Sequence, residues 1–489
     1  MNSIKKNYIY NTLLQILLLI VPIITTPYLT RVIGAEGLGV YSYYFSIASY
    51  FVIFIKLGID NYGNRTIAEH KNNQLELNTS FSELIYLQFF LGGIIVTIYI
   101  VYAFCFSSDR KYVLLFLVLV LSSCFDITWY LSGMEEFKSI SIRNAAIKLL
   151  NTTLIFLLIK EENDVFKYCL ILILGSLVSQ IIAWPLVLKT TKLVKVHIKG
   201  IIKHLKPNLL LFLTVISVSI FKIMDKIMLG LMTSGKMEVG FYESSERIIH
   251  IPSILVVSLG TVMMPRISNM IALHDNSYKK IFFTSIMFSM AISSSITFGI
   301  MGISKEFVPF FYGAGFERNE LLFLILLPCC PFMAFANVIR TQYLLPNHRD
   351  KDFLISGILA ASVNLIANFI MIPMWGSVGA AIATLLAEII GCIYQAFVVA
   401  KELDIKKYIK YSIWFVFLGI IMFICIYFMH FTFCQSLILQ IVTKIIMGTL
   451  IYVMGSIIII YILSKESDEE VYFFIYSIKS LFIRFRLKS

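Results

Sequence analysis

The sequence predicts an all-α polytopic membrane protein with about fourteen transmembrane helices, and three observations lead to this. Of the 489 residues, 58% are hydrophobic and only 14% are charged, whereas about a quarter of a typical soluble domain is charged. Apolar runs of roughly 20 residues, the length that crosses a bilayer core, recur along the chain. The connections between them are short, so no extramembrane catalytic domain is expected. Helices are expected throughout, because backbone N–H and C=O groups in lipid need hydrogen-bond partners within the protein and a helix supplies its own.

Each predicted span is one apolar run bounded by polar or charged residues. In chain order the spans cover residues 8–32, 38–59, 80–105, 112–132, 140–159, 166–188, 207–232, 239–264, 281–303, 320–345, 353–373, 376–400, 410–431 and 437–463. The first run has no small-residue cleavage site after it, so we interpret it as a retained helix rather than a signal peptide.

The distribution of lysine and arginine predicts the topology. Outside the spans these residues fall mainly in every second connection and in both terminal segments, which the positive-inside rule assigns to the cytoplasm. The net charge of +12 is therefore interpreted as a topology signal, and no nucleic-acid partner is expected. The histidines of the connections, His197, His204, His274 and His348, are predicted to be scattered in cytoplasmic loops without a shared role.

An internal repeat indicates two related halves. "TRVIGAEGLGVY" (30–41) and "DKIMLGLMTSGKMEVGFY" (225–242) both place charged or polar residues at the end of a span, then a Gly-containing turn, then Gly-x-Tyr opening the next span. Arg31 corresponds to Lys226 and Tyr41 to Tyr242. Two further matches follow in the same order, at 130–151 with 343–364 and at 176–182 with 384–390. Repeats of this kind are typical of transporters in which two bundles move about a central site.

The repeat predicts two pseudo-symmetric six-helix bundles around a central cavity, with two further helices at the end. The expected boundaries are 1–190 for the first bundle, 191–206 for a basic cytoplasmic linker, 207–402 for the second bundle, 403–463 for helices thirteen and fourteen, and 464–489 for a cytoplasmic tail. The tail is acidic at its start and basic at its end around an aromatic core, which predicts an interfacial helix.

Ionisable residues inside spans are costly and mark candidate functional groups. The strongest cationic candidates are Arg31, Lys148, Lys222, Lys226 and Arg247. Lys222, Asp225 and Lys226 share one helical face, where the excess positive charge suits an anionic ligand such as a phosphate. A buried Lys222–Asp225 pair is the alternative, and Arg31 at a span end is also compatible with snorkelling.

Local spacing predicts two ion pairs, because residues four apart lie on one face of a helix. These pairs are Lys56 with Asp60 and Glu243 with Arg247. Asp126 stands alone within its span and is interpreted as structural. The acidic candidates for ion coupling are Asp60, Asp225, Glu246 and Glu388. The eight cysteines form neither a disulfide framework nor a zinc spacing, so we expect no metal and no cofactor.

Residues 26–68, "TPYLTRVIGAEGLGVYSYYFSIASYFVIFIKLGIDNYGNRTIA", resemble the opening of Wzx-type flippases. These belong to the polysaccharide transport branch of the multidrug/oligosaccharidyl-lipid/polysaccharide exporter superfamily. The shared pattern is Pro-Tyr-x-x-Arg, Gly-x-x-Gly-x-Tyr, Leu-Gly-Ile and Gly-x-Arg. "DKIMLG", "GFYESSERI", "MMPRIS" and "GSVGAAIATLLAE" are also similar to that branch, so the resemblance covers most of the chain.

The resemblance implies a flippase that moves undecaprenyl-diphosphate-linked oligosaccharide repeat units across the bacterial cytoplasmic membrane by alternating access, for O-antigen or capsule biosynthesis. It implies a lipid-linked oligosaccharide as substrate, the phospholipid bilayer as surroundings, and the polysaccharide polymerase and chain-length machinery as partners. Arg31, Lys148, Lys222, Lys226 and Arg247 would then line a cationic cavity for the sugar and diphosphate. No covalent chemistry is required, so the protein is not expected to be an enzyme.

Two alternatives are weighed against this function. A cation-coupled multidrug exporter of the same fold would favour an acidic, aromatic cavity, whereas basic residues outnumber acidic ones within these spans. A membrane polymerase or acyltransferase would need a long outer loop or an intramembrane His/Asp constellation, and the sequence has neither.

Overall fold

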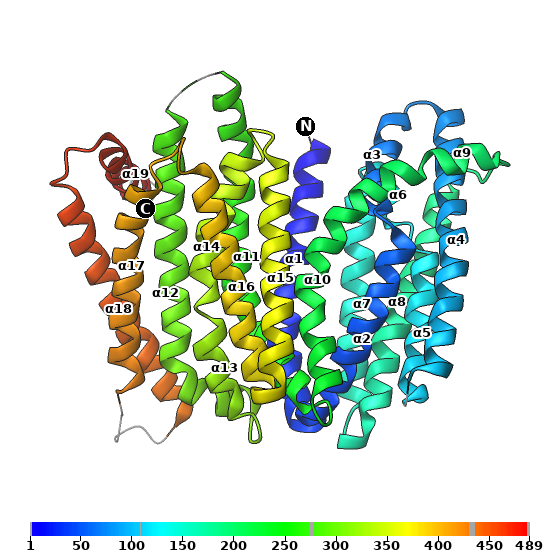
Figure 1. Cartoon of the computed structure of the whole chain (residues 1–489), viewed down its shortest axis with the longest axis horizontal. Helices are drawn as coiled ribbons and strands as arrows, with labels where there is room; N and C mark the ends of the chain where they lie inside the picture. Colours follow the sequence, from blue (N-terminus) through cyan, green and yellow to red (C-terminus); the bar gives the residue numbers. More distant parts are fainter. Residues whose placement is uncertain (1, 108, 274, 276, 430–435, 487–489) are drawn as a thin grey trace. The chain divides into compact units, whose positions relative to one another are not determined.

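The computed structural model is built of helices that follow the predicted spans (Figure 1). It describes the backbone of residues 2–107, 109–273, 275, 277–429 and 436–486. Side chains of residues 2–9, 11–12, 210, 213–215, 217–218, 220–222, 255–259, 261–262 and 481–486 lie outside the described part. No β-strand occurs among the residues described. By backbone contacts the chain divides into two compact units, Met1–Gly240 and Phe241–Ser489.

The first unit holds the helices up to the start of α11. Their bounds are α1 (Asn2–Val32), α2 (Gly34–Lys56), α3 (Ile59–His70), α4 (Gln74–Cys105), α5 (Arg110–Cys124), α6 (Thr128–Gly133), α7 (Phe137–Leu158), η1 (Glu162–Asp164), α8 (Val165–Leu188), α9 (Ile198–Lys203) and α10 (Leu205–Met232). Within this unit α1 packs on α7, α7 on α8, and α5 on α2, α4 and α8. Helix α10 lies against α2 and α3.

The second unit continues with the remaining helices. Their bounds are α11 (Met237–Ala272), α12 (Tyr278–Tyr312), α13 (Arg318–Leu326), α14 (Cys329–Ile339), the π-helix η2 (Arg340–Leu344), α15 (Asp350–Trp375), α16 (Ser377–Val399), α17 (Ile405–Tyr427), α18 (Leu437–Leu463) and α19 (Glu469–Arg486). Helix α15 packs on α16, as α7 does on α8 in the first unit, and α14 packs on α16 as α5 does on α8. This recurrence of neighbours is what an internal repeat predicts.

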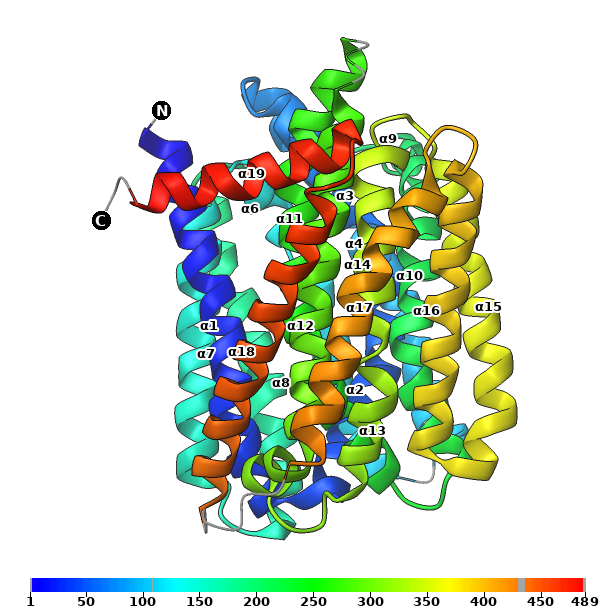
Figure 2. The same cartoon turned by 90° about the vertical axis from the view of Figure 1, so that its left-hand side faces the viewer.

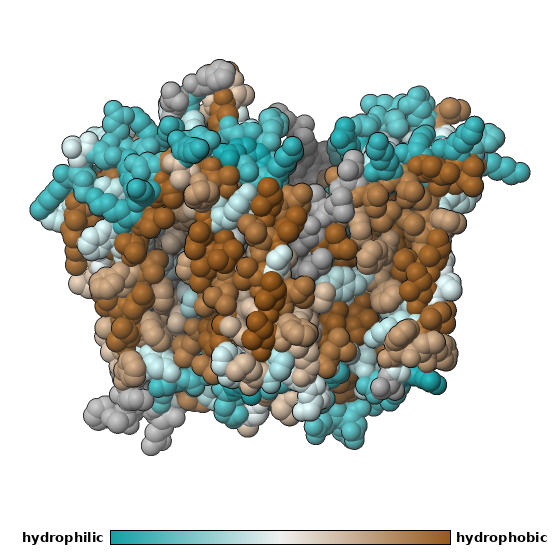
Figure 3. Space-filling view, viewed as in Figure 1, coloured by the Kyte–Doolittle hydropathy of each residue, from teal (hydrophilic) through white to brown (hydrophobic). Residues whose placement is uncertain are grey.

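The predicted membrane class and helix number are confirmed. Twelve helical segments among the described residues are long and apolar enough to cross a membrane, and α10 and α11 cover the two remaining predicted spans. Hydrophobic residues cover the middle of the helices in each unit, and hydrophilic residues gather at their ends (Figure 3). The boundaries drawn from the sequence at 190, 206 and 402 stay predictions.

Two predicted spans are interrupted, which hydropathy did not indicate. The span predicted at 112–132 ends its first helix at Cys124 and resumes at Thr128, and the one at 320–345 is divided into α13, α14 and η2. The span predicted at 281–303 is longer than expected, because α12 continues to Tyr312. The predicted tail helix is present as α19, which packs on α12 and lies across the end of α18 (Figure 2).

Candidate functional site

The cations predicted in the first unit lie at different depths. Arg31 is exposed in the last turn of α1, where its Nη1 donates to the Pro27 carbonyl at 2.6 Å. Lys148 is half-buried at the middle of α7, and Lys226 is half-buried towards the end of α10. Lys222 precedes it by one turn on α10, but its side chain lies outside the described residues.

Arg247 belongs to α11 of the second unit and forms the predicted local ion pair. Its Nε donates to Glu243 Oε1 at 2.8 Å. One turn further along α11, His250 Nε2 lies 3.8 Å from the carboxylate of Glu246, one of the four coupling candidates. Arg247 is thus a half-buried cation held by a neighbouring carboxylate, an arrangement that fixes its guanidinium group in place.

The other coupling candidates have distinct surroundings. Asp60 is half exposed at 52% and lies 3.0 Å from Lys56, so this predicted ion pair is confirmed. Asp225 is buried on α10 at 2% exposure. Glu388 is half-buried on α16, where Arg340 of η2 is close enough to interact with it electrostatically. None of the described contacts assigns ion coupling to these carboxylates, and that role stays a prediction.

Asp126 is not the isolated acid that the sequence suggested. Its carboxylate lies 2.6 Å from Lys56 Nζ and accepts the Thr128 backbone N–H at 2.9 Å. Lys56 therefore contacts two carboxylates, Asp60 from its own neighbourhood and Asp126 from the break between α5 and α6. Sequence spacing does not indicate this contact, because the two residues are far apart in the sequence.

Gln88 explains how the break between α5 and α6 is tolerated. An interrupted membrane helix exposes carbonyl groups that must find partners inside the protein. The fully buried amide of Gln88 donates to the carbonyls of Ser123, Cys124 and Asp126 at 2.9, 3.1 and 3.0 Å. Trp129 in turn donates its indole N–H to Gln88 Oε1 at 3.1 Å, so the amide is fixed on both sides.

The second unit contains a buried ion pair that sequence reasoning also missed. Lys444 of α18, only 1% exposed, lies 2.7 Å from Glu306 of α12. The predicted span ended at residue 303, which placed Glu306 outside the membrane. The longer α12 brings it inside, opposite Lys444.

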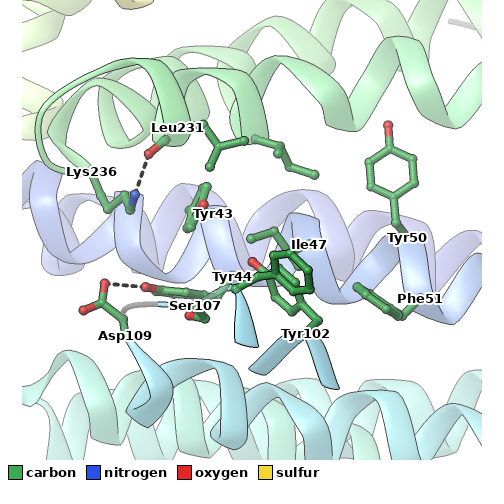
Figure 4. Close-up of a pocket in the computed structure, with 13 residues that line it drawn as sticks. Tyr43, Tyr44, Ile47, Tyr50, Phe51, Tyr102, Ser107, Asp109, Leu231 and Lys236 are labelled. Carbon is green, nitrogen blue, oxygen red and sulfur yellow. Dashed lines mark hydrogen bonds between the residues drawn. The ribbon is translucent and has the colours of Figure 1, made fainter. Parts of the chain in front are cut away.

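The first unit also contains an aromatic cavity of about 560 Å³ between α2, the end of α4 and the end of α10 (Figure 4). The α4–α5 and α10–α11 connections, which the topology places on the same side, both reach it. Its aromatic residues are Tyr43, Tyr44, Tyr50, Phe51, Tyr102 and Phe106. Asp109 and Lys236 are its charged residues. The tyrosine-rich stretch at 41–50 is the sequence signal for this cavity, but it does not indicate Asp109 or Lys236, which other segments supply.

Two models of known protein families match this chain. The model of the family described as "Polysaccharide biosynthesis protein" matches residues 4–271, more than half of the chain. The chain belongs to the polysaccharide biosynthesis protein family. A second family model, "Lipid II flippase MurJ", matches residues 146–453. The recognition of a Wzx-type flippase of the multidrug/oligosaccharidyl-lipid/polysaccharide exporter superfamily is confirmed.

Two relatives are similar to this chain along most of its length, and a third along less than half of it. A "Putative O-antigen transporter" of Shigella dysenteriae is 24% identical over 79% of this chain and 97% of its own. A protein of the same description from Escherichia coli K12 is 21% identical over 79% of this chain and 94% of its own. The lipid II flippase MurJ of Thermosipho africanus is 29% identical over 42% of this chain and 41% of its own.

Two solved structures have a fold similar to that of this chain. The lipid II flippase MurJ in an inward closed conformation covers 94% of this chain and 99% of its own, with a TM-score of 0.73 at 19% identity. An inward-facing multidrug resistance MATE transporter covers 81% and 96%, with a TM-score of 0.57 at 14% identity. The MATE match is the weaker of the two.

Proposed function

We propose that the protein is a flippase that moves undecaprenyl-diphosphate-linked oligosaccharide repeat units across the bacterial cytoplasmic membrane by alternating access. The observation that carries this proposal is that one chain aligns with O-antigen transporters over 79% of its length and shares the MurJ fold over 94%. The product would be O-antigen or capsule. Flipping changes no covalent bond, so we place the protein among transporters rather than enzymes.

The cationic candidates give this proposal its chemistry. A diphosphate carries two acidic groups, and lysine and arginine side chains are the groups that bind phosphates. We propose that Arg31, Lys148, Lys222, Lys226 and Arg247 contact the diphosphate and sugar, and that Asp60, Asp225, Glu246 or Glu388 couples the cycle to a cation gradient. Basic excess within the spans disfavours a multidrug exporter of cationic compounds, which is the alternative function.

The proposal includes the membrane, the orientation and the partners of the protein. We place the protein in the inner membrane with both termini in the cytoplasm, because the positive-inside rule assigns its basic connections to that side. The polymerase and the chain-length machinery are the partners expected to receive the flipped unit.

Deletion of the gene is the direct test of the proposed function. We expect surface polysaccharide to be lost and its lipid-linked precursor to accumulate on the inner leaflet, because no route remains for the sugar to cross the membrane. Both are measured by polysaccharide gel analysis and by mass spectrometry of extracted lipid-linked sugars, with plasmid-borne wild type as the control. Unchanged polymer without retained precursor would remove the flippase proposal.

Paired removal of the two lysines on α10 tests the proposed cationic site. Lys222→Ala with Lys226→Ala is expected to abolish export while membrane insertion is retained, because two of the positive charges that attract a diphosphate are lost. The matched control is Lys192→Ala with Lys195→Ala, since both lysines are exposed in the connection before α9. Export is measured by complementation of the deletion strain. Normal polymer from the α10 double variant would contradict a role for these lysines.

A further inference from the structure

The aromatic cavity of the first unit has a lining that suits a sugar. Figure 4 shows the side chains of Tyr43, Tyr44 and Tyr102 beside the cavity, with Asp109 at one end and Tyr50 towards the other. Its volume of about 560 Å³ falls within the range of roughly 300–1,000 Å³ usual for small-molecule sites. The aromatic rings provide flat apolar walls, and a few polar groups at fixed positions provide direction.

Hydrogen bonds fix the polar end of this cavity. Tyr44 donates its hydroxyl to Asp109 Oδ2 at 2.5 Å. This contact uses one lone pair of the carboxylate, and a carboxylate has about four positions that accept hydrogen bonds. The Asp109 carboxylate can therefore accept hydrogen bonds from the hydroxyl groups of a ligand while Tyr44 holds the carboxylate in position. The Tyr50 hydroxyl is buried and has no hydrogen-bond partner among the side chains that the structure describes.

Two contacts hold the Lys236 side chain at the cavity wall. Its Nζ donates to the Gly230 carbonyl at 2.5 Å and lies 3.8 Å above the ring centroid of Tyr43. Burial lowers the pKa of Lys236, which weakens its hold on a proton. A phosphate in this cavity would also meet the negative charge of Asp109. The arrangement disfavours an anion and suits a ligand rich in neutral hydroxyl groups.

A sugar ring matches this combination of groups. It presents C–H bonds on its faces, which pack on aromatic rings, and hydroxyl groups around its edge, which donate to a carboxylate. Phe51 and Tyr102 lie with their ring centroids 5.9 Å apart and form a continuous aromatic wall. Tyr99 packs edge-on against Phe51 at 4.7 Å and donates to the Val113 carbonyl, so the wall is held rigidly.

We infer that this cavity is a saccharide-binding subsite, at the end of the first unit that the topology assigns to the cell exterior. It binds a neutral part of the oligosaccharide through the aromatic wall and Asp109, separately from the cations proposed for the diphosphate. The inference rests on the proposed function, since it identifies which part of the substrate this part of the protein holds. A saccharide bound there is held on the release side of the membrane.

Binding of a lipid-free sugar tests the subsite directly. The probe is the oligosaccharide obtained by partial acid hydrolysis of the host strain's surface polysaccharide, added to the full chain in nanodiscs and followed by saturation-transfer NMR. Asp109→Asn is expected to weaken binding about tenfold or more, because a hydrogen bond to a charged acceptor is lost. Tyr102→Ala is expected to weaken it similarly, and Tyr102→Phe, which keeps the ring, is expected to stay within about threefold of wild type.

Two matched controls separate the cavity from its surroundings. Tyr86→Ala removes a 37% exposed tyrosine from the same helix, α4, outside the cavity. Glu162→Gln neutralises an exposed carboxylate in the α7–α8 connection, which the topology places on the same side as Asp109. Both are expected to bind as wild type does. Size-exclusion profiles and thermal unfolding temperatures show whether each variant is folded, and Tyr102→Ala keeps the test decisive if Asp109→Asn is not.

The outcomes distinguish this inference from the flippase proposal. If Asp109→Asn and Tyr102→Ala both bind the oligosaccharide as wild type does, the subsite is overturned. The flippase proposal still stands in that case, provided that the wild-type gene restores the polymer in the deletion strain. Displacement of the bound oligosaccharide by inorganic phosphate also overturns the subsite, since the cavity is then an anion site. Failure of wild type to restore the polymer removes the flippase proposal, whatever the cavity binds.

Discussion

Replacing Lys444 with methionine is expected to lower the free energy of unfolding by about 3–5 kcal/mol. Lys444 is 1% exposed and lies 2.7 Å from Glu306, and the second carboxylate oxygen of Glu306 has no hydrogen-bond partner among the residues described. Removing the lysine leaves a carboxylate buried without its counter-charge, and the cost of that state is large. The measurement is the unfolding of purified protein by SDS titration in mixed micelles.

A double variant separates this cost from the value of the ion pair itself. Lys444→Met combined with Glu306→Gln removes both charges, and we expect it to recover most of the stability lost by Lys444→Met alone. Lys406→Met is the matched control, because Lys406 is an exposed lysine on α17 of the same unit. Equal stability of Lys444→Met and Lys406→Met would show that the pair does not hold α12 and α18 together.

The comparison of these ion pairs shows what the sequence could predict. Lys56 with Asp60 and Glu243 with Arg247 were predicted because four-residue spacing on a helix decides the contact by itself. Lys444 with Glu306 joins helices that are distant in the sequence, so only the folded chain brings them together. The sequence likewise shows Asp126 as a lone acid, because nothing local indicates Lys56 as its partner.

Some features of the fold are likewise predictable from local sequence, and others depend on tertiary contacts. Length and hydropathy predicted the membrane spans, because the bilayer imposes both. They did not predict the break at 125–127, where Gln88 supplies the missing hydrogen bonds from another helix. His204 was expected to be an ordinary loop residue, yet it is 3% exposed and lies 2.9 Å from both Glu83 and the Tyr62 hydroxyl. Composition does not report such tertiary contacts.

Two glycines at corresponding positions of the internal repeat lie where the backbone approaches most closely. Gly39 and Gly240 precede Tyr41 and Tyr242, the tyrosines that correspond in the two halves. A Cβ added at Gly39 would lie 1.7 Å from the Lys236 carbonyl oxygen, and one added at Gly240 would lie 1.9 Å from the Ala35 carbonyl oxygen. The N-terminal part of α2 and residues 236–240 therefore meet backbone to backbone within the first unit.

Glu36 strengthens this contact between the two repeated turns. Its carboxylate accepts the backbone N–H of Lys236 at 2.9 and 3.0 Å. A side chain at either glycine would push against backbone atoms, which cannot rotate away as a flexible side chain can.

Gly39→Ala is therefore expected to destabilise the protein by about 1–3 kcal/mol, the usual cost of overpacking, and to impair export. Gly93→Ala is the matched control, because Gly93 lies within α4 and a Cβ there has no atom within 4 Å. Alanine favours a helix over glycine by about 0.8–1 kcal/mol, so this control should be as stable as wild type or more stable. Thermal unfolding of the purified variants and complementation of the deletion strain measure the two effects. Equal unfolding temperatures and equal polymer for both variants would show that the close backbone approach at Gly39 contributes neither to stability nor to export.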